Sequence, residues 1–273
     1  MKTIKTILIL TIAGVTFVTS CKKKGCTDHH AQNYDAKAKT DDGSCTYAPV
    51  AETETDFKLM FYHMSGTQAF ALNTTYVDDF GNDYQFTRAQ LYLSNPSFFD
   101  DNGNELGDHD HPTYALVNHD VETYDFGHVP VGHIHSMEFL VGIDSVTNHS
   151  DPSSYAAGHP LANQSPTTHW TWNAGYIFIM LEGVVDMNDN GTFDAGETFL
   201  FHIGLDSYKV NVPLMAHFNA EAGMASTVHL NLDWSKFLSS IDLSIDNSTH
   251  TMGAGASLAG RVKSNVTSAF SLH

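Results

Sequence analysis

Basic residues are scarce in this chain of 273 residues, which carries 13 Lys and Arg against 31 Asp and Glu, a formal net charge of -18. Because affinity for a phosphate backbone depends on Lys and Arg, this balance excludes a general nucleic-acid-binding protein. Glycine (20) and proline (8) are too few for a low-complexity chain, and 42% apolar residues are typical of a globular protein of one or two domains. The excess of carboxylates favours a cation as the partner.

Long apolar runs are confined to the N-terminus, where Lys2 and Lys5 precede an apolar stretch over residues 7–18 that ends in Thr-Ser-Cys. This pattern predicts a signal peptide over residues 1–20, and the alternative is an uncleaved anchor. The small residues before Cys21 are similar to a bacterial lipobox. We therefore expect an exported protein, lipid-anchored through Cys21 to a membrane on the periplasmic side or at the cell surface.

Cysteine is also rare. If Cys21 carries lipid, Cys26 and Cys45 remain, and in an oxidising compartment such a pair is most simply a disulfide; the alternative is a metal role for the two thiols. The loop between them has no apolar residues for a core, so the crosslink would act by constraining the unfolded chain, by about 3 kcal/mol. Residues 21–55 are predicted to be a tether and a disulfide-closed spacer.

Residues 56–273 have the pattern of β-structure. Short, often alternating segments rich in aromatic and β-branched residues are bounded by turn sequences, which predicts an all-β domain, an antiparallel β-sandwich with long loops. The expected strands are residues 57–64, 85–94, 135–144, 175–184, 197–204, 208–214 and 226–234. Residues 234–245 could hold a helical turn.

Residues 186–197, DMNDNGTFDAGE, have the spacing of an EF-hand calcium loop. Calcium takes six to eight oxygens, which alternate side chains can supply, and Gly191 permits the sharp turn. The predicted ligands are Asp186, Asn188, Asn190, Thr192 through its carbonyl, Asp194 and Glu197. Both flanks are strand-like instead of helical, so we expect weak, structural calcium binding that stiffens a hairpin; the alternative is an ordinary polar hairpin loop.

Histidine is abundant, with 17 residues. The pairs His109/His111 and His133/His135 are spaced so that a strand would aim both rings at one face, and the second pair could therefore chelate a metal. Imidazole with thioether suits copper, and both types occur near His63 and His250. Many of the histidines would nevertheless be ordinary surface or hydrogen-bonded core residues.

The segment HPLANQSPTTHWTWNAGYIFIMLEG, residues 159–183, resembles the hallmark of the MbnP-like copper-binding proteins. RAQLYLSN (88–95), VPVGHIHSMEFLVGID (129–144), FHIG (201–204) and THTMG (249–253) agree in order, so the resemblance covers residues 56–273. It implies a β-sandwich that binds copper in periplasmic or surface copper acquisition or homeostasis.

Candidate copper ligands can also be named. His159, His202 and His250 lie in segments that match family motifs, and His169 directly precedes Trp170. We expect a site that draws on His63, His202 and His250, because a sandwich assembles a cavity from single residues of distant strands. Characterised relatives contain kynurenine made from tryptophan by a partner di-haem enzyme of the MauG type. Trp170 or Trp172 would be the oxidised residue; the alternative is that both are core aromatics.

Catalytic motifs are absent: the sequence contains no Gly-x-Ser-x-Gly elbow, Walker loop, dinucleotide fingerprint or His-Glu-x-x-His helix. We therefore expect a binding protein and not an enzyme. The alternative function is a non-metal surface or periplasmic module that binds carbohydrate or protein through exposed aromatic residues.

Overall fold

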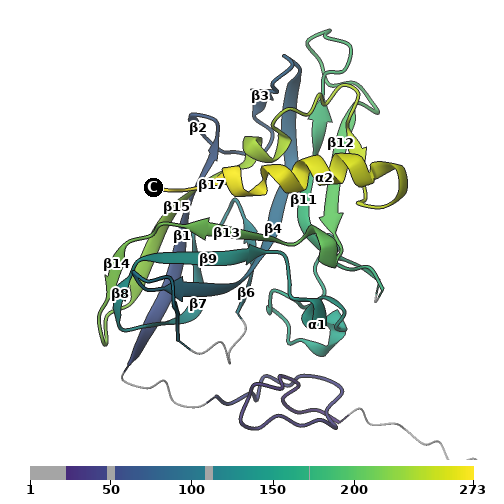
Figure 1. Cartoon of the computed structure of the whole chain (residues 1–273). Helices are drawn as coiled ribbons and strands as arrows, with labels where there is room; N and C mark the ends of the chain where they lie inside the picture. Colours follow the sequence, from purple (N-terminus) through teal and green to yellow (C-terminus); the bar gives the residue numbers. More distant parts are fainter. Residues whose placement is uncertain (1–22, 48–52, 108–112, 172) are drawn as a thin grey trace, which may run out of the picture.

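The computed structural model describes residues 23–47, 53–107, 113–171 and 173–273 (Figure 1). The expected signal peptide, Cys21, the His109/His111 pair and Trp172 lie outside the described residues. Across the described ranges, no helix is long and apolar enough to cross a membrane.

One sheet of the fold has five strands. It comprises β1 (Glu54–Ser65), β2 (Gln68–Ala69), β7 (Thr123–Pro130), β15 (Ser226–Asp233) and β17 (Phe270–Leu272). The long first strand is its centre: β15 pairs with β1 in parallel, and β7 and β2 pair with it antiparallel. Alternate residues Phe57, Leu59 and Phe61 are buried, so one face of β1 supplies the core.

The larger sheet has ten strands, ordered β13-β9-β4-β11-β12-β16 with four short strands at its margins. Its strands are β3 (Thr75–Val77), β4 (Asp83–Phe99), β5 (Glu105–Leu106), β6 (Tyr114–Asn118), β9 (Ser136–Val141), β10 (His169–Thr171), β11 (Gly175–Val185), β12 (Thr198–Gly204), β13 (Val210–Leu214) and β16 (Ser248–Thr249). A separate two-stranded ladder joins β8 (Gly132–Ile134) to β14 (Phe218–Ala220).

Helical segments are few and short. They are α1 (Ser145–Asn148), α2 (Ala256–Asn265) and the 3-10 turns η1 (Pro152–Ser154), η2 (Asp206–Tyr208), η3 (Trp234–Leu238), η4 (Gly253–Gly255) and η5 (Val266–Ala269). The helical turn expected near residue 234 is η3. Helix α2, which packs beside β12 and β16, was not anticipated.

The two large sheets meet through aromatic side chains. Phe57 of β1 contacts Phe98 of β4 edge-on at 4.8 Å between ring centroids, and Phe139 of β9 contacts Phe270 of β17 at 5.1 Å. Such tilted pairs place a ring edge against a ring face, the arrangement that aromatic quadrupoles favour. The predicted β-sandwich is confirmed, and each of the seven expected strands is present. The β1/β15 and β12/β16 pairs are parallel, contrary to a purely antiparallel sandwich.

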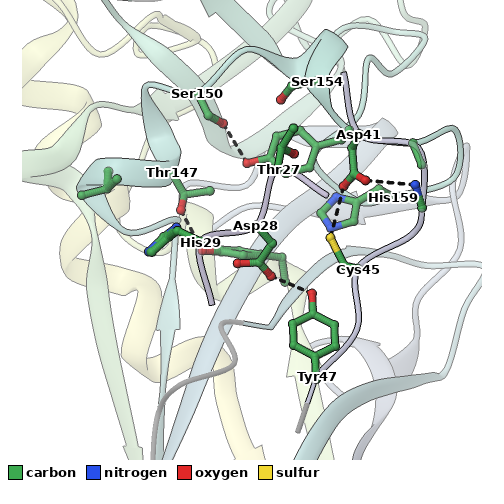
Figure 2. A pocket seen from close by; sticks show the side chains of 15 residues that line it. Thr27, Asp28, His29, Asp41, Cys45, Tyr47, Thr147, Ser150, Ser154 and His159 are labelled. Atoms are coloured by element: carbon green, nitrogen blue, oxygen red, sulfur yellow. Dashed lines mark hydrogen bonds between the residues drawn. The ribbon is translucent and has the colours of Figure 1, made fainter. Parts of the chain in front are cut away.

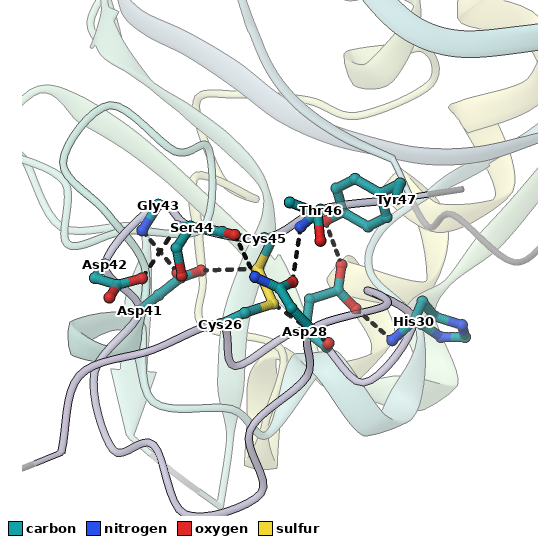
Figure 3. The surroundings of a disulfide bond; sticks show 11 residues. Cys26, Asp28, His30, Asp41, Asp42, Gly43, Ser44, Cys45, Thr46 and Tyr47 are labelled. Carbon is teal, nitrogen blue, oxygen red and sulfur yellow. Dashed lines mark hydrogen bonds between the residues drawn. A yellow bond between two sulfur atoms is a disulfide. The ribbon is translucent and has the colours of Figure 1, made fainter. Parts of the chain in front are cut away.

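The disulfide predicted between Cys26 and Cys45 is present, with 4.7 Å between the two Cα atoms (Figure 3). Asp residues build the turns around it: Asp28 accepts from the His30 backbone N–H at 2.9 Å, and Asp41 accepts from that of Gly43 at 2.9 Å. The backbone N–H of Asp41 also donates to the Ser154 carbonyl at 2.8 Å, which docks the spacer against the sandwich. Crosslink and turns replace the missing apolar core of this segment.

Gly183 lies where β11 passes closest to its neighbours. A Cβ atom there would lie 2.0 Å from the Gln85 carbonyl oxygen and 2.4 Å from a ring carbon of Phe199. Gly260, in the middle of α2, has nothing within 4 Å of its Cβ position.

We therefore predict opposite effects of two identical substitutions. Gly183→Ala destabilises the protein by about 3 kcal/mol, because backbone and a buried ring must shift. Gly260→Ala, the matched control, stabilises it by about 0.5–1 kcal/mol, because alanine loses less backbone entropy in a helix. Urea unfolding measures both; equal stability of the two variants would contradict the close approach at Gly183.

Candidate metal centre

Three neighbouring strands, β4, β11 and β12, carry apolar residues on the core face, and on the other face polar residues together with the fully buried Met180. Leu181 and Phe201 pair on the core face, whereas Met180 of β11 lies directly opposite His202 of β12 and Gln90 of β4. The next row on that second face contains Arg88 and Glu182. We call this second surface of the three strands the outer face. Because side chains alternate along a strand, the register alone gathers these residues there.

An ion-pair network orders the outer face. Arg88 Nη1 and His202 Nε2 each lie 2.9 Å from Glu182 Oε1, and Arg88 Nη2 lies 3.2 Å from Met180 Sδ. Hydrogen bonding from His202 and Arg88 lowers the pKa of Glu182 although the carboxyl is partly buried. Glu182 is thus a carboxylate that fixes the orientation of the His202 imidazole.

His250 reaches the outer face from the other side of β12. The segment after β16 is fastened to β12 by Thr251, whose hydroxyl donates to the His202 carbonyl at 2.7 Å and accepts from the Gly204 N–H at 3.0 Å. Thr251 has φ 71°, a left-handed conformation that is rare for a β-branched residue. The result is an edge-on contact between the His202 and His250 rings, 5.2 Å between centroids.

The segment 159–171 covers part of the outer face. The Tyr92 hydroxyl donates to the Pro160 carbonyl at 2.9 Å, and the Tyr176 hydroxyl donates to the Leu161 carbonyl at 2.6 Å. Trp170 lies against Gly204: a Cβ built on that glycine would come within 2.7 Å of the indole ring. Because Gly204 follows His202 by two residues along β12, Trp170 and His202 share one face of the sheet.

The structure does not bring His63 to this group. His63 lies on β1, in the five-stranded sheet, where its Nδ1 accepts from the buried indole N–H of Trp234 at 3.1 Å and its Nε2 lies 3.1 Å from the Val121 carbonyl. Burial lowers the pKa of His63, so the ring is neutral and holds both hydrogen bonds at pH 7. Both nitrogens are engaged in holding η3 and the 121 loop to β1.

His169 and His159 occupy separate surroundings. The His169 Nε2 is buried and has no hydrogen-bond partner among the described residues, and its ring meets Tyr176 edge-on at 4.7 Å. The His159 ring stacks on Tyr155 at 4.6 Å, and its Nδ1 accepts from the Leu161 N–H at 3.1 Å. Burial lowers the pKa of both imidazoles, which favours the neutral form that metals bind.

His159 also lines a pocket of about 460 Å³ between the spacer and the sandwich (Figure 2). Asp28, Asp41 and Tyr47 line it from the spacer, and Tyr155 and His159 line it from the sandwich. The Tyr47 hydroxyl donates to Asp28 at 2.6 Å across one wall. Aromatic rings and carboxylates therefore share one cavity of a size suited to a small molecule.

The predicted calcium loop connects β11 to β12, with strands on both flanks as expected. Its proposed ligands converge: Asp186 accepts from the Gly191 N–H at 2.7 Å, and Glu197 accepts from the Asp194 N–H at 2.8 Å and from Asn188 Nδ2 at 2.9 Å. Asp186 and Glu197 are both buried. The loop is therefore closed on itself around two buried carboxylates.

Sequence reasoning missed Arg88, Met180 and Glu182 as members of the site. The strand pattern could have identified them, because alternation along the strands places all three on the face that also carries His202. It also missed His217, whose imidazole joins those of His133 and His135 in a cluster. Nothing in the local sequence marks His217, because the imidazoles it meets come from β8 (His133) and from the residue directly after β8 (His135).

Comparison with known proteins gives one family and one solved structure. The structure is "MbnP from Methylosinus trichosporium", which is 16% identical and has a TM-score of 0.48, with 74% of this chain and 82% of that chain covered. No curated protein matches the chain. The MbnP family profile matches residues 54–252, which include the ten-stranded sheet, all of the five-stranded sheet except β17, the outer face and the calcium-like loop. The chain therefore belongs to the MbnP family.

Proposed function

We propose that this protein is an exported copper-binding lipoprotein that acts in copper acquisition or homeostasis. Membership of the MbnP family supports the proposal, since the sequence resemblance associates that family with copper. The observation that carries it is the pairing of the His202 and His250 rings on the outer face. We infer a binding role instead of an enzymatic one, because the outer face presents metal donors with no adjacent nucleophile–base pair among the described residues.

The donor set of the outer face suits copper. His202 and His250 offer imidazole nitrogens, and Met180, directly across from His202, offers a thioether. Soft sulfur together with imidazole favours copper over calcium or magnesium. When His202 donates its Nε2 proton to Glu182, its Nδ1 keeps a lone pair for a metal, the arrangement in which a carboxylate orients a ligating histidine. Within the described residues the His250 imidazole makes no hydrogen bond, so its nitrogens are available.

Copper uptake tests this assignment. We predict that His202→Ala and His250→Ala each lose one equivalent of Cu(I), measured by metal analysis and by competition with a chromogenic chelator under reducing conditions. His229→Asn is the control, because His229 is an exposed imidazole on β15. Wild-type Cu(I) content in both outer-face variants would refute the site.

We further propose that Trp170 is the tryptophan that a MauG-like di-haem peroxidase oxidises to kynurenine. Its ring lies on the His202 side of β12 and is only partly buried, so an altered ring would border the copper donors. Trp234 is the internal comparison, because it is fully buried and donates to His63.

Peptide mapping of protein purified from its native host tests this proposal. We expect the mass of kynurenine in the peptide containing residue 170 and unmodified tryptophan at residue 234. Kynurenine only at Trp172, or unmodified tryptophan throughout, would contradict the assignment to Trp170.

We propose that calcium binds the 186–197 loop and stiffens the β11–β12 hairpin. The convergence of Asp186, Asn190, Asp194 and Glu197 supports a ligand set of oxygens. Three carboxylates and an exported location are typical of weak, structural binding, near 10⁻⁴–10⁻³ M for extracellular modules, to order of magnitude.

We predict that calcium raises the melting temperature of the wild type and that Glu197→Gln abolishes the increase. Glu197 would close the site with two oxygens, and the amide keeps its size but removes its charge. Asp189→Asn is the matched control, because Asp189 lies in the same loop outside the ligand positions and has φ 54°, which Asn tolerates. Calorimetry showing no heat of calcium binding to the wild type would refute the site.

The location is also a proposal. We place the protein outside the cytoplasm, tethered by lipid on Cys21, with the spacer of residues 23–47 between the anchor and the sandwich. The disulfide between Cys26 and Cys45 supports an oxidising compartment, because cytosolic thiols are kept reduced.

The second candidate function is a non-metal module that binds a carbohydrate or a protein. The cavity of about 460 Å³ favours it, because Tyr47, Tyr155 and His159 offer ring faces beside the carboxylates of Asp28 and Asp41. Sugar recognition uses this mixture of stacking surface and polar groups. Retention on a glycan array by a protein that takes up no copper would favour this candidate.

A further inference from the structure

A second set of imidazoles gathers on the two-stranded ladder of β8 and β14. In its register Asn219 lies opposite His133, and Phe218 opposite Ile134. His135 comes directly after Ile134 and His217 directly before Phe218, so both lie next to the last pair of the ladder. The three imidazoles meet there, since one ring nitrogen of each lies near those of the other two, and the Asn219 side chain contacts His133.

The other side of the ladder anchors it in the core. Ile134 is fully buried, and the Phe218 ring stacks at 6.1 Å from Phe57 and lies edge-on at 6.5 Å from Phe98. The backbone N–H of His135 donates to the Phe99 carbonyl at 2.9 Å, which fastens the ladder to the end of β4. The backbone that carries the imidazoles is therefore held in place by the core and by β4. A ligand would need to order little of it on binding.

The imidazoles are close enough to share one ion. One ring nitrogen from each of His133, His135 and His217 lies within 4.8 Å of the other two. The His135 and His217 rings meet edge-on at 4.4 Å, and those of His133 and His217 are 6.1 Å apart. In a tetrahedral zinc site with bonds of about 2.0–2.1 Å, ligand atoms lie roughly 3.4 Å apart, so small side-chain rotations suffice.

A carboxylate lies beside two of the three imidazoles. Asp101, in the turn between β4 and β5, places its Oδ1 3.1 Å from His135 Nδ1 and 3.6 Å from His133 Nε2. His133 Nδ1 lies 3.1 Å from Asn219 Oδ1, and donation to that oxygen leaves the Nε2 lone pair directed at the cluster. A hydrogen bond of this kind to the second ring nitrogen is the usual way in which proteins orient a metal-ligating histidine.

The other histidines in the described part of the chain do not form such a group. His128 pairs with Asp56 and His119 with Asp120, each as one imidazole and one carboxylate. In the described ranges the remaining cluster of potential ligands is Asp28, His29 and His30, three consecutive residues. There the Asp28 oxygens already accept from Tyr47 and from the His30 backbone N–H. The β8–β14 cluster differs because its three imidazoles come from two segments far apart in the sequence, at β8 and at the start of β14, and a carboxylate from a third segment lies beside them.

We propose that His133, His135, His217 and Asp101 form a binding site for a divalent transition-metal ion of the zinc type. Three neutral imidazoles and one carboxylate supply the four ligands of a tetrahedral Zn²⁺ site. The cluster contains no sulfur, which separates it from the outer face with Met180 and favours a borderline divalent ion over Cu(I). Figure 1 shows β8 and β14 on the opposite side of the sandwich from β11 and β12, so the two sites are independent.

Zinc titration of the chelator-stripped full-length protein tests the proposal. The wild type is expected to bind an equivalent of Zn²⁺ that His135→Ala and His217→Ala lose, and Asn219→Ala is expected to bind it about 10-fold more weakly, because its amide orients His133. His229→Asn and His202→Ala, which alter imidazoles outside the cluster, should retain that equivalent. Co²⁺ in place of Zn²⁺ should give the visible absorption of a tetrahedral site in the wild type and not in His135→Ala.

The alternative outcomes are equally definite. The proposal is overturned if the wild type takes up no Zn²⁺, or if His135→Ala and His217→Ala retain full uptake. The proposed ligand side chains are partly exposed, so we expect these variants to fold with the melting temperature of the wild type. If His217→Ala fails to fold, His217→Gln, which preserves polarity, replaces it. Loss of the cobalt spectrum in His202→Ala would move the ion to the outer face and reject the cluster.

Discussion

The alternation of side chains along β4, β11 and β12 is the constraint on which both the core and the outer face depend. On one side, Ala89, Leu181 and Phe201 contribute to the core between the two sheets. On the other, Gln90, Met180 and His202 form one row and Arg88 and Glu182 the next. A slip of one residue in either pairing would exchange the two sets and bury an ion pair in the core. Core packing therefore also fixes the position of the proposed metal donors.

Much of the fold could be predicted from the sequence, because strands and turns are local signals. The seven expected strands and the Cys26–Cys45 disulfide are present, and the strand flanks of the 186–197 loop agree with its interpretation as a hairpin. The parallel pairing of β1 with β15 was not predictable, because it joins segments more than 160 residues apart. Helix α2 was missed because its sequence, ASLAGRVKSN, contains glycine and serine and has a weak apolar face.

The candidate site was less predictable, since its residues meet only after the strands have paired. His202 and His250 were expected as ligands. The structure brings them together because the Thr251 hydroxyl ties the segment after β16 to β12. His63 was expected beside them, yet it serves Trp234 and the Val121 carbonyl in the other sheet. Its position on an alternating strand gave no indication of which sheet β1 would join. The expectation for His202 and His250 was right and that for His63 was wrong, because the outcome depends on which strands pair, and a single sequence does not reveal this.

Hydrogen-bond partners, more than the abundance of histidine, decide what each imidazole can do. A ring whose two nitrogens are both engaged, as in His63, must give up two hydrogen bonds before it can bind a metal, and in a buried setting each costs about 1–3 kcal/mol. A ring with one nitrogen held by a carboxylate or an amide, as in His202 and His133, is oriented by that bond and keeps the other nitrogen for a ligand. Hydrogen bonds at both ring nitrogens therefore oppose metal binding, whereas a hydrogen bond at one nitrogen favours binding at the other. On this argument local bonding separates His63 from the histidines of the two proposed metal sites, and the acidic surface would contribute only a long-range attraction for cations.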